Sequence, residues 1–271
     1  MLADTHAHIH FEDYRDDLAV IFKNARDNDV GRIICVGTDE EDSHRALDFV
    51  CDELVARHAG GVRLEATVGL HPHEAHRAQS ALEAIAFLLK VGQPIAIGEC
   101  GLDYYRNLSN REEQQAALVF QIELALEHDL PLVFHVRDAW DDFFATIKMY
   151  PALRGVVHSF TGGPNEVELA MKYNLYFGMN GIMTFTKDQQ QLKAARLVPA
   201  DRLLLETDSP YLTPAPLRGK RNEPANVALV ARSLSELRDE EYGTLADKTN
   251  ENVNKLFGVS KENTRKVGSQ I

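Results

Sequence analysis

The chain has 271 residues, of which 44% are apolar, so it can bury a large core, and its length is ordinary for a single α/β barrel. Its formal net charge is −12, with 41 Asp and Glu residues against 29 Lys and Arg residues. Proteins that coat nucleic acid through surface charge are usually basic, so this balance argues against broad coating, although a local cationic patch remains compatible with it.

The sequence shows no membrane or export signal. It contains no run of 18 apolar residues and no basic segment followed by an apolar one at its start, so we expect neither a transmembrane helix nor a signal peptide. The three cysteines, Cys35, Cys51 and Cys100, are odd in number and have no CxxC spacing. We therefore expect reduced thiols in a cytoplasmic protein.

Eight short apolar runs bounded by turn residues recur along the chain. They comprise residues 2–9, 32–37, 66–70, 95–99, 132–136, 155–159, 175–179 and 203–206. The segments between them carry apolar residues at helical spacing, and the repeat of about 30 residues is the size of one βα unit. Runs that are apolar throughout indicate strands buried on both sides, as in a parallel sheet.

Eight βα units predict a closed (β/α)8 barrel, the TIM-barrel fold, as a single domain of residues 1–271. An open, doubly wound sheet is the alternative. Residues 226–237 and 242–257 both have helical patterns, which would complete the outer ring with one extra C-terminal helix. Only the polar stretch after about residue 259 has a composition compatible with disorder.

Polar residues gather at the ends of the predicted strands, where TIM barrels carry their working groups. Within the first run, His6 and His8 point the same way, because side chains alternate across a strand. Later runs end in further potential metal ligands, namely Glu99, His135, His158 and Asp208. Each alone also fits a structural role, such as a hydrogen-bonded His or a turn-forming Asp, but their joint placement at one mouth predicts a metal centre.

Six ligands are too many for one open tetrahedral zinc site and fit two divalent ions that share a bridging carboxylate. Imidazoles with carboxylates suit zinc, manganese, iron or nickel better than magnesium, which we keep among the candidates. We expect Glu99 to be the bridge, because its strand lies midway round the barrel between the two pairs of His. Asp208 is the candidate to bind one ion and to hold, or take, the proton of a bridging nucleophilic water.

Three separated stretches carry a resemblance to the TatD family of metal-dependent hydrolases, within the amidohydrolase-like metal barrels. They are Asp4-Thr5-His6-Ala7-His8, residues 131–138 and residues 199–210, and residues 98–104 and 218–224 support them. The resemblance implies a divalent-metal barrel, most often a deoxyribonuclease acting as a 3′–5′ exonuclease, with metal ligands at the six positions above. One departure is His10, where family members usually carry Asp or Asn, and a change there would affect the rim of the site.

Two substrate candidates lie near the strand ends. Arg137, two residues after His135, could grip a phosphate or form a salt bridge with Asp138. His71 could contact substrate or support a ligand. Glu206, two residues before Asp208, is expected to orient a ligand or Arg137 rather than to bind metal.

Residues 218–221 form the clearest local basic patch of this acidic chain. We expect Lys220 and Arg221 to contact a phosphate backbone near the barrel mouth, and a loop held by local ion pairs is the alternative.

The leading functional hypothesis is a two-metal phosphodiesterase that acts on DNA ends and needs no protein nucleophile, since the chain has no GxSxG motif. A second hypothesis keeps the metal site and changes the bond to an amide or ester, as in a D-aminoacyl-tRNA deacylase. Related barrels often bridge their metals with a carboxylated lysine, so a glutamate at position 99 favours the phosphodiesterase. A third hypothesis, a binding module without activity, would predict missing ligands, and none is missing. Native metal and oligomeric state are not readable from the sequence.

Overall fold

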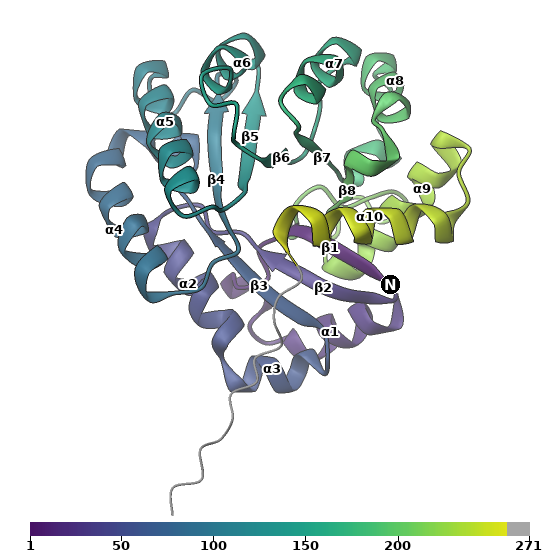
Figure 1. Cartoon of the computed structure of the whole chain (residues 1–271). Helices are drawn as coiled ribbons and strands as arrows, with labels where there is room; N and C mark the ends of the chain where they lie inside the picture. The colour runs from purple at the N-terminus through teal and green to yellow at the C-terminus, as the bar shows by residue number, and fades with distance from the viewer. Residues whose placement is uncertain (259–271) are drawn as a thin grey trace, which may run out of the picture.

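Eight parallel strands form a ring in the computed structural model, which describes residues 1–258 (Figure 1). The strands are β1 (Leu2–Ala7), β2 (Val30–Cys35), β3 (Arg63–Val68), β4 (Ala96–Asp103), β5 (Leu132–Arg137), β6 (Gly155–Val157), β7 (Tyr176–Met179) and β8 (Leu203–Leu205). Each strand pairs with the next one along the chain, in the order β1 to β8. This order confirms the predicted (β/α)8 barrel, because a doubly wound sheet would reverse its strand order partway along the chain.

The ring closes where the last strand meets the first. Ala7 forms a parallel bridge with Ser209, just beyond the end of β8. Two backbone hydrogen bonds of 2.8 Å flank it, from the N–H of His8 to the carbonyl of Ser209 and from the N–H of Asp208 to the carbonyl of His6. The seam of the barrel is therefore made by the backbone of residues that the sequence singles out as metal ligands.

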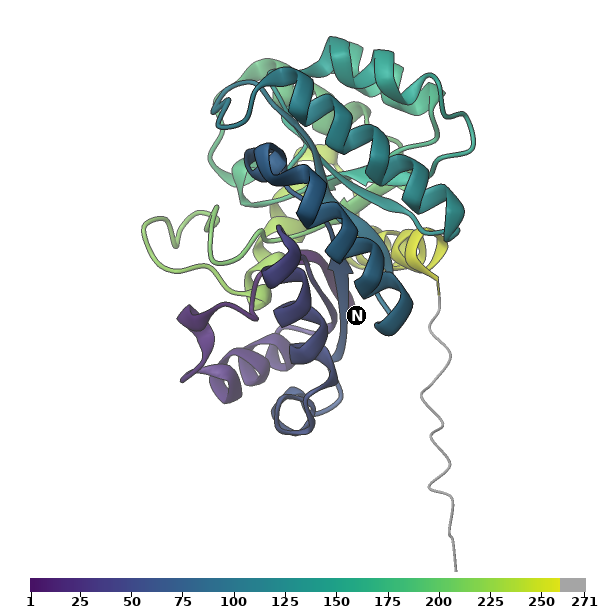
Figure 2. The same ribbon diagram turned by 90° about the vertical axis from the view of Figure 1, so that its left-hand side faces the viewer.

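Helices surround the strands (Figures 1 and 2). They are α1 (Leu18–Asp27), α2 (Glu40–Cys51), α3 (Glu53–Ala59), α4 (Ala78–Val91), α5 (Arg111–Glu127), α6 (Trp140–Ile147), α7 (Pro164–Lys172), α8 (Gln189–Leu197), α9 (Val227–Arg238) and α10 (Tyr242–Phe257). The last two confirm the predicted pair and supply the extra C-terminal helix. A second additional helix, α3, was not predicted; the Asp52 side chain caps its start by accepting hydrogen bonds from the N–H groups of Leu54 and Val55.

One end of the barrel is sealed by α10. Side chains inside the barrel, including Ala3, Ala96 and Val133, pack in one cluster with Leu256 and Phe257 of α10. These strand residues come early in their strands, so α10 covers the end at which the strands begin. The opposite end, where the strands finish, is left to form the site.

Two strand boundaries differ from the prediction by three residues or more. Strand β3 starts at Arg63 instead of residue 66, because the charged Glu65 is buried beside Arg32, with Nε of Arg32 2.5 Å from its carboxylate. Strand β4 runs to Asp103 instead of residue 99, beyond the apolar stretch that was used to find it. No helix in residues 1–258 is long and apolar enough to cross a membrane. The expected disorder after about residue 259 lies outside the described residues.

Candidate metal centre

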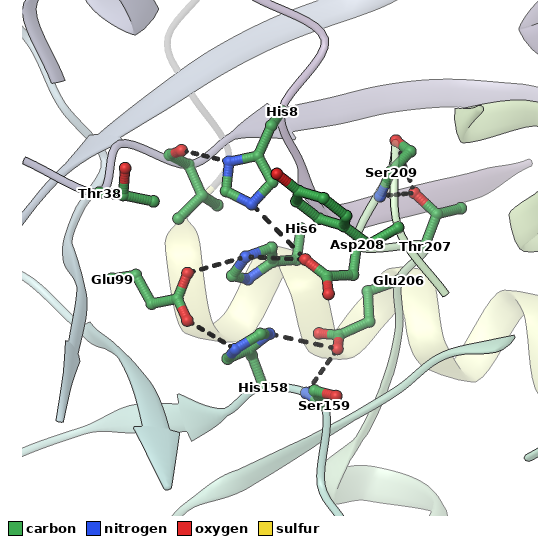
Figure 3. A network of polar contacts seen from close by, with 12 residues as sticks. His6, His8, Thr38, Glu99, His158, Ser159, Glu206, Thr207, Asp208 and Ser209 are labelled. Carbon is green, nitrogen blue, oxygen red and sulfur yellow. Dashed lines mark hydrogen bonds and ion pairs between the residues drawn. The ribbon is translucent and has the colours of Figure 1, made fainter. Parts of the chain in front are cut away.

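His6, His8 and Asp208 meet at the mouth of the barrel (Figure 3). The Nε2 atoms of His6 and His8 lie 3.7 and 3.5 Å from Oδ1 of Asp208. His6 belongs to β1, His8 follows it and Asp208 follows β8, so the two strands at the seam supply this group. Asp208 adopts a φ of 59°, a left-handed conformation that costs a non-glycine residue about 1 kcal/mol and is held by the seam.

Glu99 connects this group to a second pair of imidazoles. Its Oε2 atom lies 3.3 Å from Nε2 of His6. Its Oε1 atom lies 2.9 Å from Nδ1 of His135 and 2.8 Å from Nε2 of His158. Each carboxylate oxygen thus faces a different set of nitrogens, and all six residues predicted as metal ligands are brought together.

This donor set fits divalent cations. Both ring nitrogens of the buried His6 have no hydrogen-bond partner among the described residues, and a cation at Nε2 would satisfy one of them. Separations of 2.8 to 3.7 Å between nitrogen and oxygen suit a cation placed about 2 Å from each atom. In the tautomer that leaves Nε2 free for a cation, Nδ1 of His8 donates to the carbonyl of Val36 at 2.8 Å.

The groups of the centre shift one another's pKa values. Burial raises the pKa of the Glu99 carboxyl, but His158, His71 and His135 outweigh it and hold the pKa well below its usual value. Burial also lowers the pKa of His6, which keeps that imidazole neutral. The pKa of His158 moves the other way: burial lowers it, yet Glu99 and Glu206 raise it well above its ordinary value. Cation binding would therefore displace a proton from His158.

Asp103, which was not predicted as a site residue, holds the far side of His135. Its Oδ2 atom lies 3.1 Å from Nε2 of His135 and 2.9 Å from Nε2 of His73. This contact directs Nδ1 of His135 toward Glu99. Asp103 lies four residues after Glu99 on β4, and that even spacing along a strand is the sequence signal that would have found it.

Glu206 lies behind His158, as expected for a residue that orients a ligand (Figure 3). Its Oε1 atom accepts a hydrogen bond of 2.5 Å from the N–H of Ser159 and lies 3.6 Å from Nδ1 of His158. Asn180, at the end of β7, donates to the same oxygen at 3.3 Å. A single Asn carries no pattern by which the sequence could have revealed this contact.

His71 points a donor at the centre. Its Nε2 atom lies 3.4 Å from Oε1 of Glu99, while its Nδ1 atom accepts a hydrogen bond of 3.1 Å from the N–H of His73. Burial lowers the pKa of His71 to about 4, so the ring is neutral near pH 7 and carries its proton on Nε2. This arrangement fits contact with a substrate oxygen better than metal ligation.

Arg137 lines a cavity of about 730 Å³ that opens from the centre. Its guanidinium carbon lies 3.9 Å from the centroid of the Tyr105 ring. The alternative salt bridge with Asp138 does not form in the described part of the chain.

Lys220 and Arg221 do not line this cavity. Arg221 pairs with Asp17 at 2.6 Å, donates to the carbonyl of Asp13 and lies over the ring of Tyr14. It thereby ties the loop after β8 to the segment after β1, and both project on the same side in Figure 2. For Arg221 the structure favours the local ion pair over the expected phosphate contact, while Lys220 is exposed on the same loop.

His10 does not reach the rim of the site. Its side chain is fully buried, with Nε2 3.1 Å from Oδ1 of Asp42. The other oxygen of Asp42 accepts hydrogen bonds of 3.0 Å from the N–H and the hydroxyl of Thr38. His10 therefore supports the start of α2 rather than changing the mouth.

Known proteins are similar to this chain in sequence and in fold. A family model described as "TatD related DNase" matches residues 3–258. The chain is 36% identical over 263 residues to "Uncharacterized metal-dependent hydrolase YabD" of Bacillus subtilis (strain 168), covering 96% of this chain and 100% of that protein. It is 35% identical over 254 residues to "3'-5' ssDNA/RNA exonuclease TatD" of Escherichia coli (strain K12), covering 91% and 94% of the two chains.

Solved structures agree with the sequence matches. The TatD homologue YJJV from Escherichia coli K12 superposes with a TM-score of 0.87 at 29% identity, covering 96% of this chain and 98% of that chain. A phosphotriesterase homology protein from Escherichia coli, at a TM-score of 0.65 and 13% identity, shares the fold. The chain belongs to the family of TatD related DNases.

Proposed function

We propose that the protein is a divalent-metal-dependent 3′–5′ exonuclease that hydrolyses phosphodiester bonds at the ends of DNA strands, with two metal ions. The observation that carries this proposal is Glu99, whose two oxygens face two separate sets of imidazole nitrogens at 2.8 to 3.3 Å. A glutamate in this position suits a bridge between two cations. The exonuclease relatives supply the substrate class.

The residues divide into two sets around that bridge. His6, His8 and Asp208 would hold one ion, and His135 and His158 the other. Zinc, manganese, nickel or magnesium are the candidate ions. When bound, such a pair lowers the pKa of water and stabilises negative charge on a phosphate.

Two of the chain's own groups would move or hold protons during hydrolysis. Asp208 is ionised, because His8 and His6 outweigh the effect of burial and lower its pKa, and its side chain reaches the cavity. It is placed to take a proton from the attacking water. His71 would donate its Nε2–H to a phosphate oxygen, and Arg137 would bind a phosphate through its guanidinium.

The amide or ester alternative, including a D-aminoacyl-tRNA deacylase, has less support. The same metal residues could serve that chemistry, so the fold does not decide it. The relatives named as exonucleases and the glutamate at position 99 favour the phosphodiester.

A metal-by-substrate screen tests the proposal. Purified protein, stripped of metal and reloaded with manganese, magnesium, zinc or nickel, is incubated with 5′-labelled single- and double-stranded DNA. We expect products shortened stepwise from the 3′ end, and loss of products with EDTA. Hydrolysis of D-aminoacyl-tRNA with every DNA left intact would overturn it. Asp48→Asn, at an exposed carboxylate of α2 that does not line the cavity, serves as the active control.

A further inference from the structure

Apolar side chains beside the seam line one part of the cavity at the mouth. Four residues form this part, which we call the base wall: Phe11, Ile182, Tyr211 and Leu212. They follow β1, β7 and β8, so the base wall adjoins His8 and Asp208 at the seam. The ring centroids of Phe11 and Tyr211 lie 5.0 and 6.3 Å from that of His8. A flat apolar group bound beside the centre would meet this wall.

The opposite side of the cavity carries two arginines. Arg106 follows β4 and Arg137 ends β5, the two strands that lie across the ring from the seam. The basic residues among the described lining of the cavity are Arg106 and Arg137. In the described chain, neither guanidinium forms an ion pair or a side-chain hydrogen bond. The Arg137 guanidinium lies over the ring of Tyr105, a contact that leaves its N–H groups available to a ligand. Free guanidinium groups held in this way suit a phosphate.

The backbone under Tyr211 is fixed, although its side chain is 56% exposed. The buried Asn222 donates from Nδ2 to the carbonyls of Tyr211 and Thr207 at 2.6 and 3.0 Å. Leu212, the next residue, is held at a φ of 52°, a strained conformation for a side-chain-bearing residue. The backbone that carries Tyr211 is therefore already ordered, so a base that stacks on the ring need not order this loop backbone.

Among the described residues, the cations of the cavity lie on one side. Carboxylates line both sides, Asp39 and Asp208 beside the base wall and Glu74 and Asp103 toward β3 and β4, whereas Arg106 and Arg137 lie toward β4 and β5. A phosphate on that far side would meet the two arginines, while the described lining beside the base wall offers it no Lys or Arg.

We propose that the base of the terminal nucleotide stacks on the base wall, chiefly on Tyr211, while Arg137 and Arg106 hold the phosphate that follows the scissile one. This inference rests on the proposed exonuclease function and adds the means by which a strand end is recognised. The nucleic acid crosses the mouth from the seam to β4 and β5, with the scissile phosphate over Glu99. Stacking reads only the π-face of the base, so all four bases are accepted.

A double-mutant cycle between protein and substrate tests the stacking. The wild-type holoenzyme and Tyr211→Ala are titrated with a single-stranded oligonucleotide whose scissile linkage is a phosphorothioate, with or without the 3′-terminal base. We expect Tyr211→Ala to weaken binding about 10- to 100-fold when the base is present and less than about twofold when it is absent. Tyr211→Phe, which keeps the ring, should recover most of the affinity. Phe87→Ala removes an equally exposed ring on the outer helix α4 and is the matched control.

Fluorescence reports which nucleotide is stacked. A 2-aminopurine at the 3′-terminal position should be quenched on binding to the wild type and not to Tyr211→Ala, and at the penultimate position it should be quenched by neither. Equal quenching at both positions, or a cycle in which base removal and Tyr211→Ala weaken binding independently, overturns the proposal.

Phosphate contacts are tested in the same way. Arg137→Ala should weaken binding of the normal oligonucleotide. When the linkage next to the scissile one is an uncharged methylphosphonate, the same substitution should cost little affinity. A 3′-phosphate on the terminal nucleotide should weaken binding to the wild type. A 3′-phosphate that strengthens binding overturns the assigned direction. Failure of the proposed function is distinct from these outcomes, because unmodified DNA would then remain uncut by the wild type with every metal.

Discussion

Nε2 of His135 and Oδ2 of Asp103 lie 3.1 Å apart on the adjacent strands β5 and β4. The contact fixes the ring of His135 so that its other nitrogen faces Glu99 at 2.9 Å. An outer carboxylate of this kind both orients a metal-binding imidazole and strengthens its basicity. Asp103 is thus the residue through which one half of the centre can be altered without touching a ligand.

Asp103→Asn should selectively weaken the ion held by His135 and His158. We expect a loss of about 10- to 100-fold in the affinity of one ion, with the second retained, because His135 is the one ligand candidate that the Asp103 carboxylate contacts among the described residues. Metal titration followed by elemental analysis after dialysis measures both sites. Asp129→Asn, on an exposed carboxylate paired with Arg154, should leave the metal content unchanged. Two ions bound with wild-type affinity in Asp103→Asn would contradict the assignment.

Glu99→Gln should weaken metal binding at both parts of the proposed two-ion centre. The amide keeps the size of the side chain but not the charge that links the two sets of imidazoles, so turnover should fall roughly 100-fold or more. The number of bound ions should fall from two, as measured by elemental analysis. A variant that retains two ions and full turnover would rule out the bridging role.

The pH dependence of stability should carry the signature of His71. Burial lowers the pKa of His71 from 6.5 to about 4 in the folded, metal-free protein. Between these values the unfolded chain binds more protons than the folded one, so stability rises with pH. The contribution of His71 is complete above pH 6.5 and is lost as the pH falls to about 4, and it amounts to roughly 3 kcal/mol.

Urea unfolding of the metal-free protein at pH 7 and pH 4.5 measures this contribution. His71→Gln should show a smaller loss of unfolding free energy between the two pH values than the wild type does. His44→Gln, at a largely exposed side chain, should behave as the wild type. An identical loss in all three proteins would mean that His71 is not buried in its neutral form.

Arg221→Ala should act on stability rather than on nucleic-acid binding. It removes the ion pair with Asp17 and the contact with the Asp13 carbonyl, which we expect to cost about 1 kcal/mol in unfolding free energy. The salt dependence of DNA binding should stay the same in this variant. Lys220→Ala provides the comparison, because loss of a phosphate contact would lower the salt slope by about one. A lowered slope in Arg221→Ala would restore the phosphate contact for this residue.

The barrel was predictable because its strands are buried on both sides and stand out as continuous apolar runs. The boundaries that failed are those where burial depends on a partner distant in the sequence. Glu65 is buried in β3 because Arg32 of β2 neutralises it, and no local pattern reveals that pair. Helix α3 was missed because seven residues are too few to show a clear period.

The six ligand candidates were predictable since each lies at or near the end of a strand-like apolar run, and parallel strands bring such ends to one mouth. The supporting groups were harder to find. Asn180 reaches Glu206 because β7 and β8 are paired, and Tyr211 acquires its place from the buried Asn222, eleven residues further on. For Arg221 the two alternatives stayed open because the sequence shows its charge but not its partner Asp17, which lies 204 residues away.

The seam between β8 and β1 also sets an order of events during synthesis. The backbone of His6 and His8 closes the ring only with Asp208 and Ser209. In the proposed centre, the same Asp208 would complete the ion site that the two histidines begin. A growing chain carries these histidines among its first residues but reaches Asp208 only near the end of the last strand. Binding of the proposed ion at His6, His8 and Asp208 would therefore follow closure of the ring.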